Sequence, residues 1–364
     1  VLVRLILIKL SDSDYFQIWS NHHLNLDGWS TNAVLYEFDE LYLSKISGAA
    51  LAFKTLAPYS DYIAWLDVFD RKSALGYWSE YLTDYDTVAS FPKDKQRPIV
   101  GLNQDENRKY EPRDYEFNLP ESTTQQLQDL ASNNKITLNT VVQSAWGILL
   151  SRYNNTSDVV FGSVVSGRPS DLKGIQDMVG VFINTIPQRI RYEKEDSFTD
   201  LLKSVQTAFI TGETFHHLNL AEIQHLSELG KHLIDHLVVF ENYPISGQNK
   251  LDDNTLEQQS VNDSDEGLIL IEEGSVEVFE QMNYDFTLMA APENGLFFRM
   301  KYNAAVYSEE FVKRLKSQWL LLLEQIAEKP NQVISDLEIL TAAEKHYLLE
   351  TLNDTKADYP QDKT

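Results

Sequence analysis

Hydrophobic residues in the first part of the chain follow two spacings. Residues 1–10 and 15–23 are rich in β-branched and aromatic side chains, and a polar SDSD turn separates them, which predicts a β-hairpin. Both strands are apolar on both faces, so we expect the sheet to be covered on each side. Over residues 30–47, apolar positions recur every three or four residues, which predicts an amphipathic helix capped by Ser30 or Thr31.

The rest of the chain alternates between helical and strand-like patterns. Residues 91–112 are polar, contain prolines and lack periodicity, and they separate a first lobe from a second. Further helices are expected over residues 62–69, 74–82, 121–133, 138–153, 197–211 and 309–327, the last capped by Ser308. Strands are expected over residues 114–119, 159–165, 184–190, 233–240, 268–279, 282–290 and 296–302, the final three as an antiparallel meander. This mixture indicates an α+β fold with helices facing sheets.

Composition narrows the classes of partner. The chain of 364 residues carries 31 Lys and Arg against 55 Asp and Glu, a formal net charge of −24. Phosphate backbones and anionic lipids would repel it, so neither nucleic acid nor a membrane is an expected partner. The absence of cysteine excludes disulfides and sulfur-ligated zinc, and without an HExxH spacing no metal site is expected. The sequence shows no signal peptide or apolar span, which favours a cytoplasmic location.

The chemically informative segment is HHLNLDGWS, residues 22–30. It follows the second predicted strand and contains an Asp-Gly turn. Adjacent side chains on a strand point to opposite faces, so one imidazole faces a given cavity, and we select His23 over His22. A neutral imidazole near pH 7 can accept a proton from an attacking amine or orient that amine. The residues alone leave both roles open.

Asp27 has two interpretations. Its carboxylate could hold the tautomer of the imidazole, as in hydrolase triads, or it could pair with an arginine and fix the shape of the loop. We favour the arginine pairing. Gly28 serves either the backbone angles of the turn or the approach of its amide to a developing oxyanion. A second HHLNL at residues 216–220 is followed by Ala-Glu instead of Asp-Gly, and we expect it to be structural.

Several motifs in the right order make the chain resemble the condensation domains of nonribosomal peptide synthetases. HHLNLDGWS is similar to the HHxxxDG(W)S active-site motif of that family. Residues 59–65 (YSDYIAW) resemble its YxD(F/Y)xxW motif, and residues 179–189 (VGVFINTIPQR) its (I/V)GxFVNTxxxR motif. Residues 166–169 (SGRP) and 240–244 (FENYP) match two more segments. Plant-type CoA-dependent acyltransferases share HxxxDG but carry a DFGWG motif that we do not find, and the DGWS ending favours condensation over epimerization.

The resemblance covers almost the whole chain and implies its organisation, an α+β fold of two chloramphenicol-acetyltransferase-like lobes in a V. Only 21 residues precede His22, whereas the family motif lies behind a segment with two further motifs, so the N-terminal lobe is expected to be incomplete. We assign residues 1–105 to the partial N-terminal lobe, 106–338 to the C-terminal lobe and 339–364 to a linker toward an adenylation domain. Residues 217–222 replace the family's HQDYPFE motif, and its RDxSRNP motif is not recognisable.

The resemblance implies an amide-forming acyltransferase. A donor acyl or peptidyl thioester and an acceptor aminoacyl thioester would react in a tunnel at the junction of the lobes. Both would be carried on the phosphopantetheine of carrier domains, so the chain itself is expected to bind no cofactor. Upstream and downstream carrier domains and an adjacent adenylation domain are the implied partners. The alternative is a non-catalytic condensation-like module that docks carrier or tailoring proteins.

The resemblance also assigns roles to individual residues. The expected catalytic residues are His23, Asp27 and Gly28, and the expected substrate-binding residues are His22, Ser166, Arg168 and Asn184. Arg168 would pair with Asp27 and join the two lobes. Ser166 would contact the acceptor amine, and Asn184 would lie near the cavity. For Ser166 and Asn184 a purely structural role is equally open.

Overall fold

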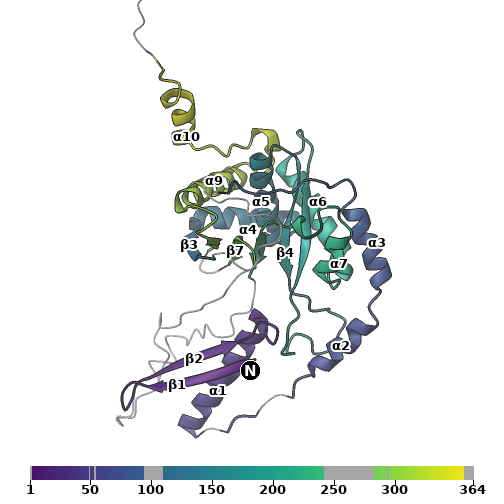
Figure 1. Cartoon of the computed structure of the whole chain (residues 1–364), viewed down its shortest axis with the longest axis vertical. Helices are drawn as coiled ribbons and strands as arrows, with labels where there is room; N and C mark the ends of the chain where they lie inside the picture. The colour runs from purple at the N-terminus through teal and green to yellow at the C-terminus, as the bar shows by residue number, and fades with distance from the viewer. Residues whose placement is uncertain are drawn as a thin grey trace, which may run out of the picture. The chain divides into compact units, whose positions relative to one another are not determined.

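The computed structural model of the chain (Figure 1) describes residues 2–48, 50–52, 55–93, 110–241, 283–292 and 295–355. The strands are β1 (Val3–Lys9), β2 (Tyr15–Asn21), β3 (Pro112–Asn118), β4 (Asp158–Val165), β5 (Asn184–Arg191), β6 (Leu237–Phe240), β7 (Phe286–Ala291) and β8 (Phe297–Asn303). The α-helices are α1 (Gly28–Ser47), α2 (Tyr59–Asp67), α3 (Arg71–Tyr81), α4 (Glu121–Asn134), α5 (Leu138–Asn154), α6 (Phe198–Gly212), α7 (Leu220–His225), α9 (Glu309–Glu328) and α10 (Ala342–His346). The predicted mixture of helices and strands is confirmed.

The described chain divides into two compact units. The first takes in residues up to Arg71 together with Val165–Asn184, and the second takes in Lys72–Val164, Thr185–Glu241 and residues from Asn283 onward. The expected lobe boundary at residues 105 and 106 lies outside the described residues and stays a prediction. The compact units divide the chain differently, because residues 72–93 group with the second unit and residues 165–184 with the first.

In the first unit, β1 and β2 form the predicted antiparallel hairpin, with Val3 opposite Asn21 and Lys9 opposite Tyr15. β1 is exposed along its whole length, and Leu7 is 63% exposed. The expectation that this sheet is covered on each side is therefore wrong for the residues that the structure describes. Apolar residues on both faces of a strand lead to burial only where other parts of the structure pack against both faces, and a short local pattern does not encode that packing.

The helix α1 begins at Gly28, two residues before the predicted start. Its N-cap is Asp27, whose carboxylate accepts a hydrogen bond from the Ser30 N–H, so the expected cap by Ser30 or Thr31 is wrong. Asp is as favourable an N-cap as Ser, and the extended backbone of Asp27 (φ −86°, ψ 175°) places its side chain over the first turn. At the other end, Gly48 adopts the left-handed conformation (φ 69°) that commonly ends a helix.

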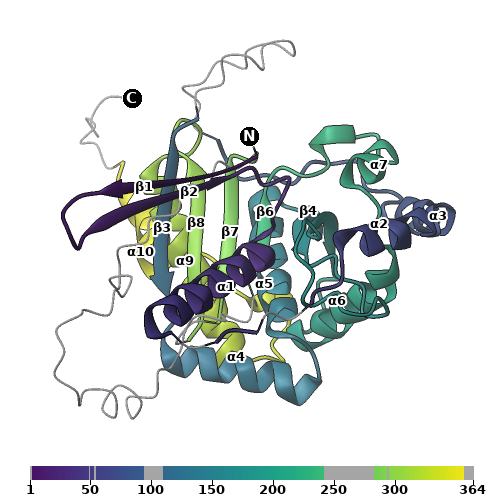
Figure 2. The same ribbon diagram turned by 90° about the horizontal axis from the view of Figure 1, so that it is seen from below.

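The second unit contains a six-stranded sheet in the order β3-β8-β7-β6-β4-β5, and Figure 2 shows its first five strands side by side. β8 pairs antiparallel with β3 and β7, whereas β6 pairs parallel with β7 and β4. Of the expected three-stranded meander, the antiparallel pair β7–β8 is confirmed, and residues 268–279 lie outside the described residues. The strand expected over residues 233–240 is shorter than predicted, because residues 233–236 form bends and irregular backbone and β6 begins at Leu237.

The core of the second unit lies between this sheet and the helices α4, α5 and α9. Phe286 and Phe298 on the strands are fully buried in one cluster with Trp146 of α5 and Trp319 of α9. Burying each such side chain contributes about 1.5–3 kcal/mol, so this cluster stabilises the packing of the sheet against the helices. Ser308 caps α9 through the Phe311 N–H, as expected. Among the described helices, none combines the length and the hydropathy needed to cross a membrane.

Candidate active site

All seven predicted site residues belong to the first unit. The strand β2 ends at Asn21, and the chain then turns, with the Asn25 N–H donating to the His22 carbonyl oxygen at 3.0 Å. His22 holds this turn in place, because its Nδ1 accepts a hydrogen bond from the Leu24 N–H at 3.0 Å. Both imidazoles are exposed. The strand argument that separated His22 from His23 does not apply, since both residues lie beyond the end of β2.

Asp27 is buried, and its carboxylate is fully engaged. Oδ1 accepts a hydrogen bond from the Ser30 N–H at 2.8 Å, and Oδ2 accepts one from the Phe182 N–H at 3.0 Å. Arg168 Nη2 lies 3.7 Å from Oδ1, and the two side chains are 2% and 0% exposed. The pairing of Asp27 with Arg168 that the resemblance implied is confirmed. Both partners lie within the first compact unit.

Arg168 occupies a cage of carbonyl oxygens and aromatic rings. Its Nη1 donates to the carbonyl oxygens of Ile175 and Met178, the latter at 3.0 Å, and its Nη2 donates to Ser30 Oγ at 3.1 Å. The guanidinium carbon lies 3.9 Å from the centre of the Phe182 ring and 5.2 Å from that of Trp29. A cation buried this completely is stable only with such partners, so Arg168 fixes the structure around Asp27.

The segment 180–182 is joined to the active-site loop by its backbone. The Asp27 N–H donates to the Gly180 carbonyl oxygen at 3.2 Å. Ser30 Oγ donates to the same carbonyl at 2.8 Å and accepts from the Gly180 N–H at 3.1 Å. Together with the bond from the Phe182 N–H to Asp27, these contacts tie the start of α1 to residues far away in the sequence.

Two glycines of the site have different backbone conformations. Gly167 adopts a left-handed backbone (φ 59°), and a Cβ there would overlap the Phe182 carbonyl, so only glycine lets Arg168 reach its cage. Gly28 is the first residue of α1, in the right-handed helical conformation. Both interpretations of Gly28, the backbone angles of the turn and an amide that approaches an oxyanion, stay predictions. The first N–H groups of a helix have no partner within the helix and lie at its positive end.

Comparison with known proteins decides the family. The family model described as "Condensation domain" matches residues 1–349. The chain belongs to the condensation-domain family. It is 39% identical over 362 residues to bacitracin synthase 3 of Bacillus licheniformis, covering 100% of this chain and 5% of that protein. The chain thus spans a small part of the curated relatives that it matches.

Solved structures share the fold of this condensation-family member. A four-domain nonribosomal peptide synthetase crystallised with AMP and glycine has a TM-score of 0.73 and 21% identity, covering 94% of this chain and 26% of that one. The X-domain of teicoplanin biosynthesis, in complex with OxyB, has a TM-score of 0.70 and 18% identity, covering 93% of this chain and 73% of that one. The mixed α/β fold expected from the resemblance is confirmed, as is the resemblance to synthetase condensation domains.

The remaining predicted residues of this family member lie at the borders of the same unit. Ser166 is exposed, one residue before Gly167, and Asn184 is half-buried at the first position of β5. Sequence reasoning missed two groups that hold the loop, Ser30 Oγ and the Phe182 N–H. The DGWS ending contains Ser30, but the pattern around it indicates a helix cap and not a contact with Gly180. A backbone N–H such as that of Phe182 leaves no signal in a sequence.

The second HHLNL segment lies in the second unit and is built into its packing. His216 is 6% exposed, with its ring centre 4.9 Å from that of Phe209 and 6.2 Å from that of Trp78. His236 is also buried and accepts a hydrogen bond from Trp146 Nε1 at 2.9 Å. Burial lowers the pKa of His216 to about 4, helped by His217, and burial likewise lowers the pKa of His236 to about 4. These contacts support the structural role expected for the second copy.

Stability is expected to fall as the pH drops from about 6.5, the ordinary pKa of histidine, toward 4. In that window the unfolded chain binds more protons than the folded chain, because His216 and His236 stay neutral when buried. Urea unfolding at several pH values between 7.5 and 4.5 measures the slope of the unfolding free energy. His216→Phe keeps the aromatic packing and removes one titrating group, so its slope should be flatter than that of the wild type. An unchanged slope would contradict the assignment to His216.

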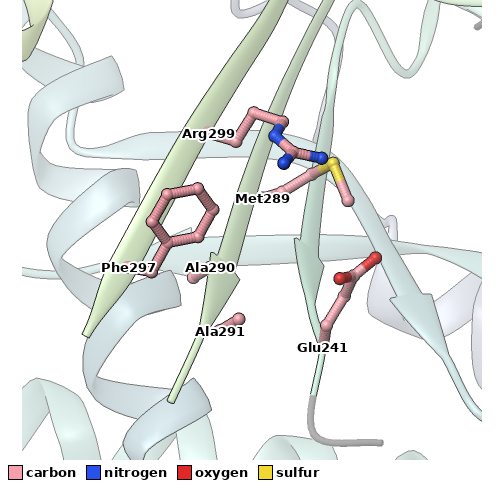
Figure 3. Close-up of a pocket in the computed structure, with 6 residues that line it drawn as sticks. All are labelled: Glu241, Met289, Ala290, Ala291, Phe297 and Arg299. Carbon is pink, nitrogen blue, oxygen red and sulfur yellow. The ribbon is translucent and has the colours of Figure 1, made fainter. Parts of the chain in front are cut away.

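A hollow of the second unit, shown in Figure 3, has a volume of about 90 Å³. Its lining residues are Glu241, Met289, Ala290, Ala291, Phe297 and Arg299. Figure 3 shows the Glu241 carboxylate and the Arg299 guanidinium on opposite sides of the Met289 side chain. Arg299 Nε is already paired with Glu116 Oε1 at 2.6 Å. None of these residues is a predicted site residue.

Among the described residues, no group of three His, Asp or Glu side chains could hold a metal ion.

Proposed function

We propose that this chain catalyses amide formation between a donor acyl or peptidyl thioester and an acceptor aminoacyl thioester. Both reactants would be carried on the phosphopantetheine of carrier domains, with an adjacent adenylation domain as a further partner. The observation that carries the proposal is the intact HHLNLDG loop of a condensation-family member, held by the buried Asp27–Arg168 pair while His23 stays exposed. The loop is thus rigid at its base and open at the imidazole.

This site needs few catalytic groups, because a thioester is already activated toward attack by an amine. Holding both reactants in line converts a bimolecular step into a nearly intramolecular one, a gain of up to about 7–11 kcal/mol. The acceptor α-amino group has an ordinary pKa of about 8, so much of it is protonated near neutral pH. In our proposal His23 accepts the amine proton or orients the neutral amine as its nitrogen attacks the thioester carbonyl, and the thiol leaves.

The other residues support that step. Asp27 and Arg168 hold the loop, and their contacts leave neither side chain available for proton transfer. The amide of Gly28, at the positive end of α1, would stabilise the oxyanion that forms on the thioester carbonyl. Ser166 and Asn184 would contact the acceptor, and His22 would hold the turn beside the substrate.

The test is an assay with purified carrier domains loaded with donor and acceptor, using the full native polypeptide. Amide product on the acceptor carrier, detected by mass spectrometry and dependent on both loaded carriers, is the expected result. Carriers that bind without forming an amide would overturn the proposal in favour of the docking module. A product released by water instead of by the acceptor amine would assign thioester hydrolysis.

A further inference from the structure

Apart from Asn184, the motifs at residues 59–65 and 179–189 have no role in the chemistry proposed above, yet they meet in the first unit. Tyr59 Oη donates to the Val181 carbonyl oxygen at 2.7 Å, and the Tyr59 ring meets the Phe182 ring edge-on with centres 5.2 Å apart. Gly180 lies so close to Tyr59 that a Cβ at this position would overlap the ring. Tyr59 therefore contacts three consecutive residues, 180, 181 and 182.

The same short segment faces the active-site loop through other atoms. The Gly180 carbonyl accepts from the Asp27 N–H and from Ser30 Oγ, and the Phe182 N–H donates to the Asp27 carboxylate. Segment 180–182 is thus held between Tyr59 and the residues that end the loop. Three residues separate Asp27 from His23, and His22 fixes the other end of that turn. A shift of the segment must move Asp27 and, with it, the turn that carries His23.

Tyr59 is itself held firmly. Its ring packs against Tyr62, with centres 5.6 Å apart, and Tyr62 packs against Phe182 at 4.8 Å. Trp65, one turn along α2, donates from Nε1 to Asp171 at 3.3 Å. Burial raises the pKa of Tyr59, and the charge of Asp27 raises it further, so the phenol remains a hydrogen-bond donor throughout the neutral range. A rigid aromatic cluster therefore backs the segment.

We propose that Tyr59 is a positioning residue for His23, acting through Gly180 and Phe182 on the Asp27 end of the loop. This inference rests on the proposed function in one respect, that His23 is the group that meets the acceptor amine. It gives a role in the active site to the motifs at residues 59–65 and 179–189. Because residue 180 is glycine, the ring of Tyr59 can pack directly against the segment 180–182. The hydrogen bond from Tyr59 Oη to the Val181 carbonyl oxygen then holds that segment in place.

The catalytic test measures kcat and KM for amide formation by the full native polypeptide and its variants. A displacement of the order of 1 Å can lower a rate by about 10²-fold, so Gly180→Ala should lower kcat by about that factor with KM nearly unchanged. Tyr59→Phe removes one hydrogen bond and should lower kcat about 2- to 10-fold. Tyr59→Ala is measured alone and in combination with Gly180→Ala. The double variant removes the overlap and should regain about tenfold in kcat over Gly180→Ala alone.

A second measurement needs no substrate. The imidazole nitrogen signals of His23, assigned in NMR spectra by their loss in His23→Ala, report the surroundings of the ring. They should move in Tyr59→Phe and in Gly180→Ala. They should stay in place in Tyr36→Phe, a matched change at a tyrosine of the same unit that is 40% exposed. Circular dichroism confirms that each variant is folded, and Tyr59→Phe keeps the test valid if Gly180→Ala does not fold.

The outcomes separate the two proposals. If the wild type forms no amide, the proposed function fails, while the His23 signals still test the positioning. If the wild type is active and the losses of Gly180→Ala and Tyr59→Ala simply multiply in the double variant, the contact between them does not position His23. Unmoved His23 signals in both Tyr59→Phe and Gly180→Ala would also overturn the inference.

Discussion

Replacing His23 with alanine is expected to lower kcat for amide formation by about 10²- to 10⁴-fold, the usual effect of losing a positioned proton acceptor. The exposed imidazole lies in a turn fixed at one end by His22 and at the other by the Asp27 carboxylate. Its removal should leave those contacts intact. KM for the loaded carriers should change little, because recognition of the carriers does not depend on one ring. Rapid-quench assays under single-turnover conditions measure the chemical step directly.

The chain supplies a matched control for this experiment. His217 occupies the second position of the other HHLNL copy and belongs to the second unit, whereas the loop that carries Asp27 belongs to the first. His217→Ala should retain the rate of the wild type, although it can lower stability because the side chain is partly buried. Equal losses in both variants would mean that neither histidine acts directly in the reaction. If His23→Ala kept full activity, the catalytic role proposed for His23 would be wrong.

Local pattern predicted most helices of this chain to within a few residues. The residues that form α9 show why, because their apolar positions repeat along one face and Ser308 caps the helix. The cap of α1 was missed, since Asp27 looked like an ion-pair residue and one carboxylate serves both purposes here. A sequence pattern assigns one role to each residue, so it does not show that Asp27 both caps α1 and pairs with Arg168.

The arrangement of the site depends on contacts that a linear pattern does not contain. The motif order identified the loop and the Arg168 partner, because both have distinctive side chains. The compact unit that joins residues 165–184 to the N-terminal part arises from a buried cation and from backbone hydrogen bonds at Gly180 and Phe182. Any residue type except proline offers a backbone N–H, so such bonds are found only in three dimensions.

The second large effect is expected from the buried ion pair. Arg168→Gln should lower the free energy of unfolding by about 3–5 kcal/mol, because it leaves the Asp27 carboxylate buried without its cation. Asp27→Asn should have an effect of similar size, since an amide group cannot accept hydrogen bonds from both the Ser30 and the Phe182 N–H groups through its two terminal atoms. Urea unfolding of the chain at pH 7 measures both.

The double variant Asp27→Asn/Arg168→Gln tests whether Asp27 and Arg168 stabilise the chain as an ion pair or independently of each other. Its loss should be smaller than the sum of the single losses by about 0.5–3 kcal/mol, because the second change no longer strands a buried charge. Asp12→Asn, at an exposed ion pair with Lys9, is the control and should leave the unfolding midpoint unchanged. If Asp27→Asn keeps the stability of the wild type but loses amide formation, Asp27 acts on the reaction itself, and the role of the pair as a structural anchor is wrong. If it loses both, then activity should return in part when the osmolyte trimethylamine N-oxide restores folding, because His23 remains in place.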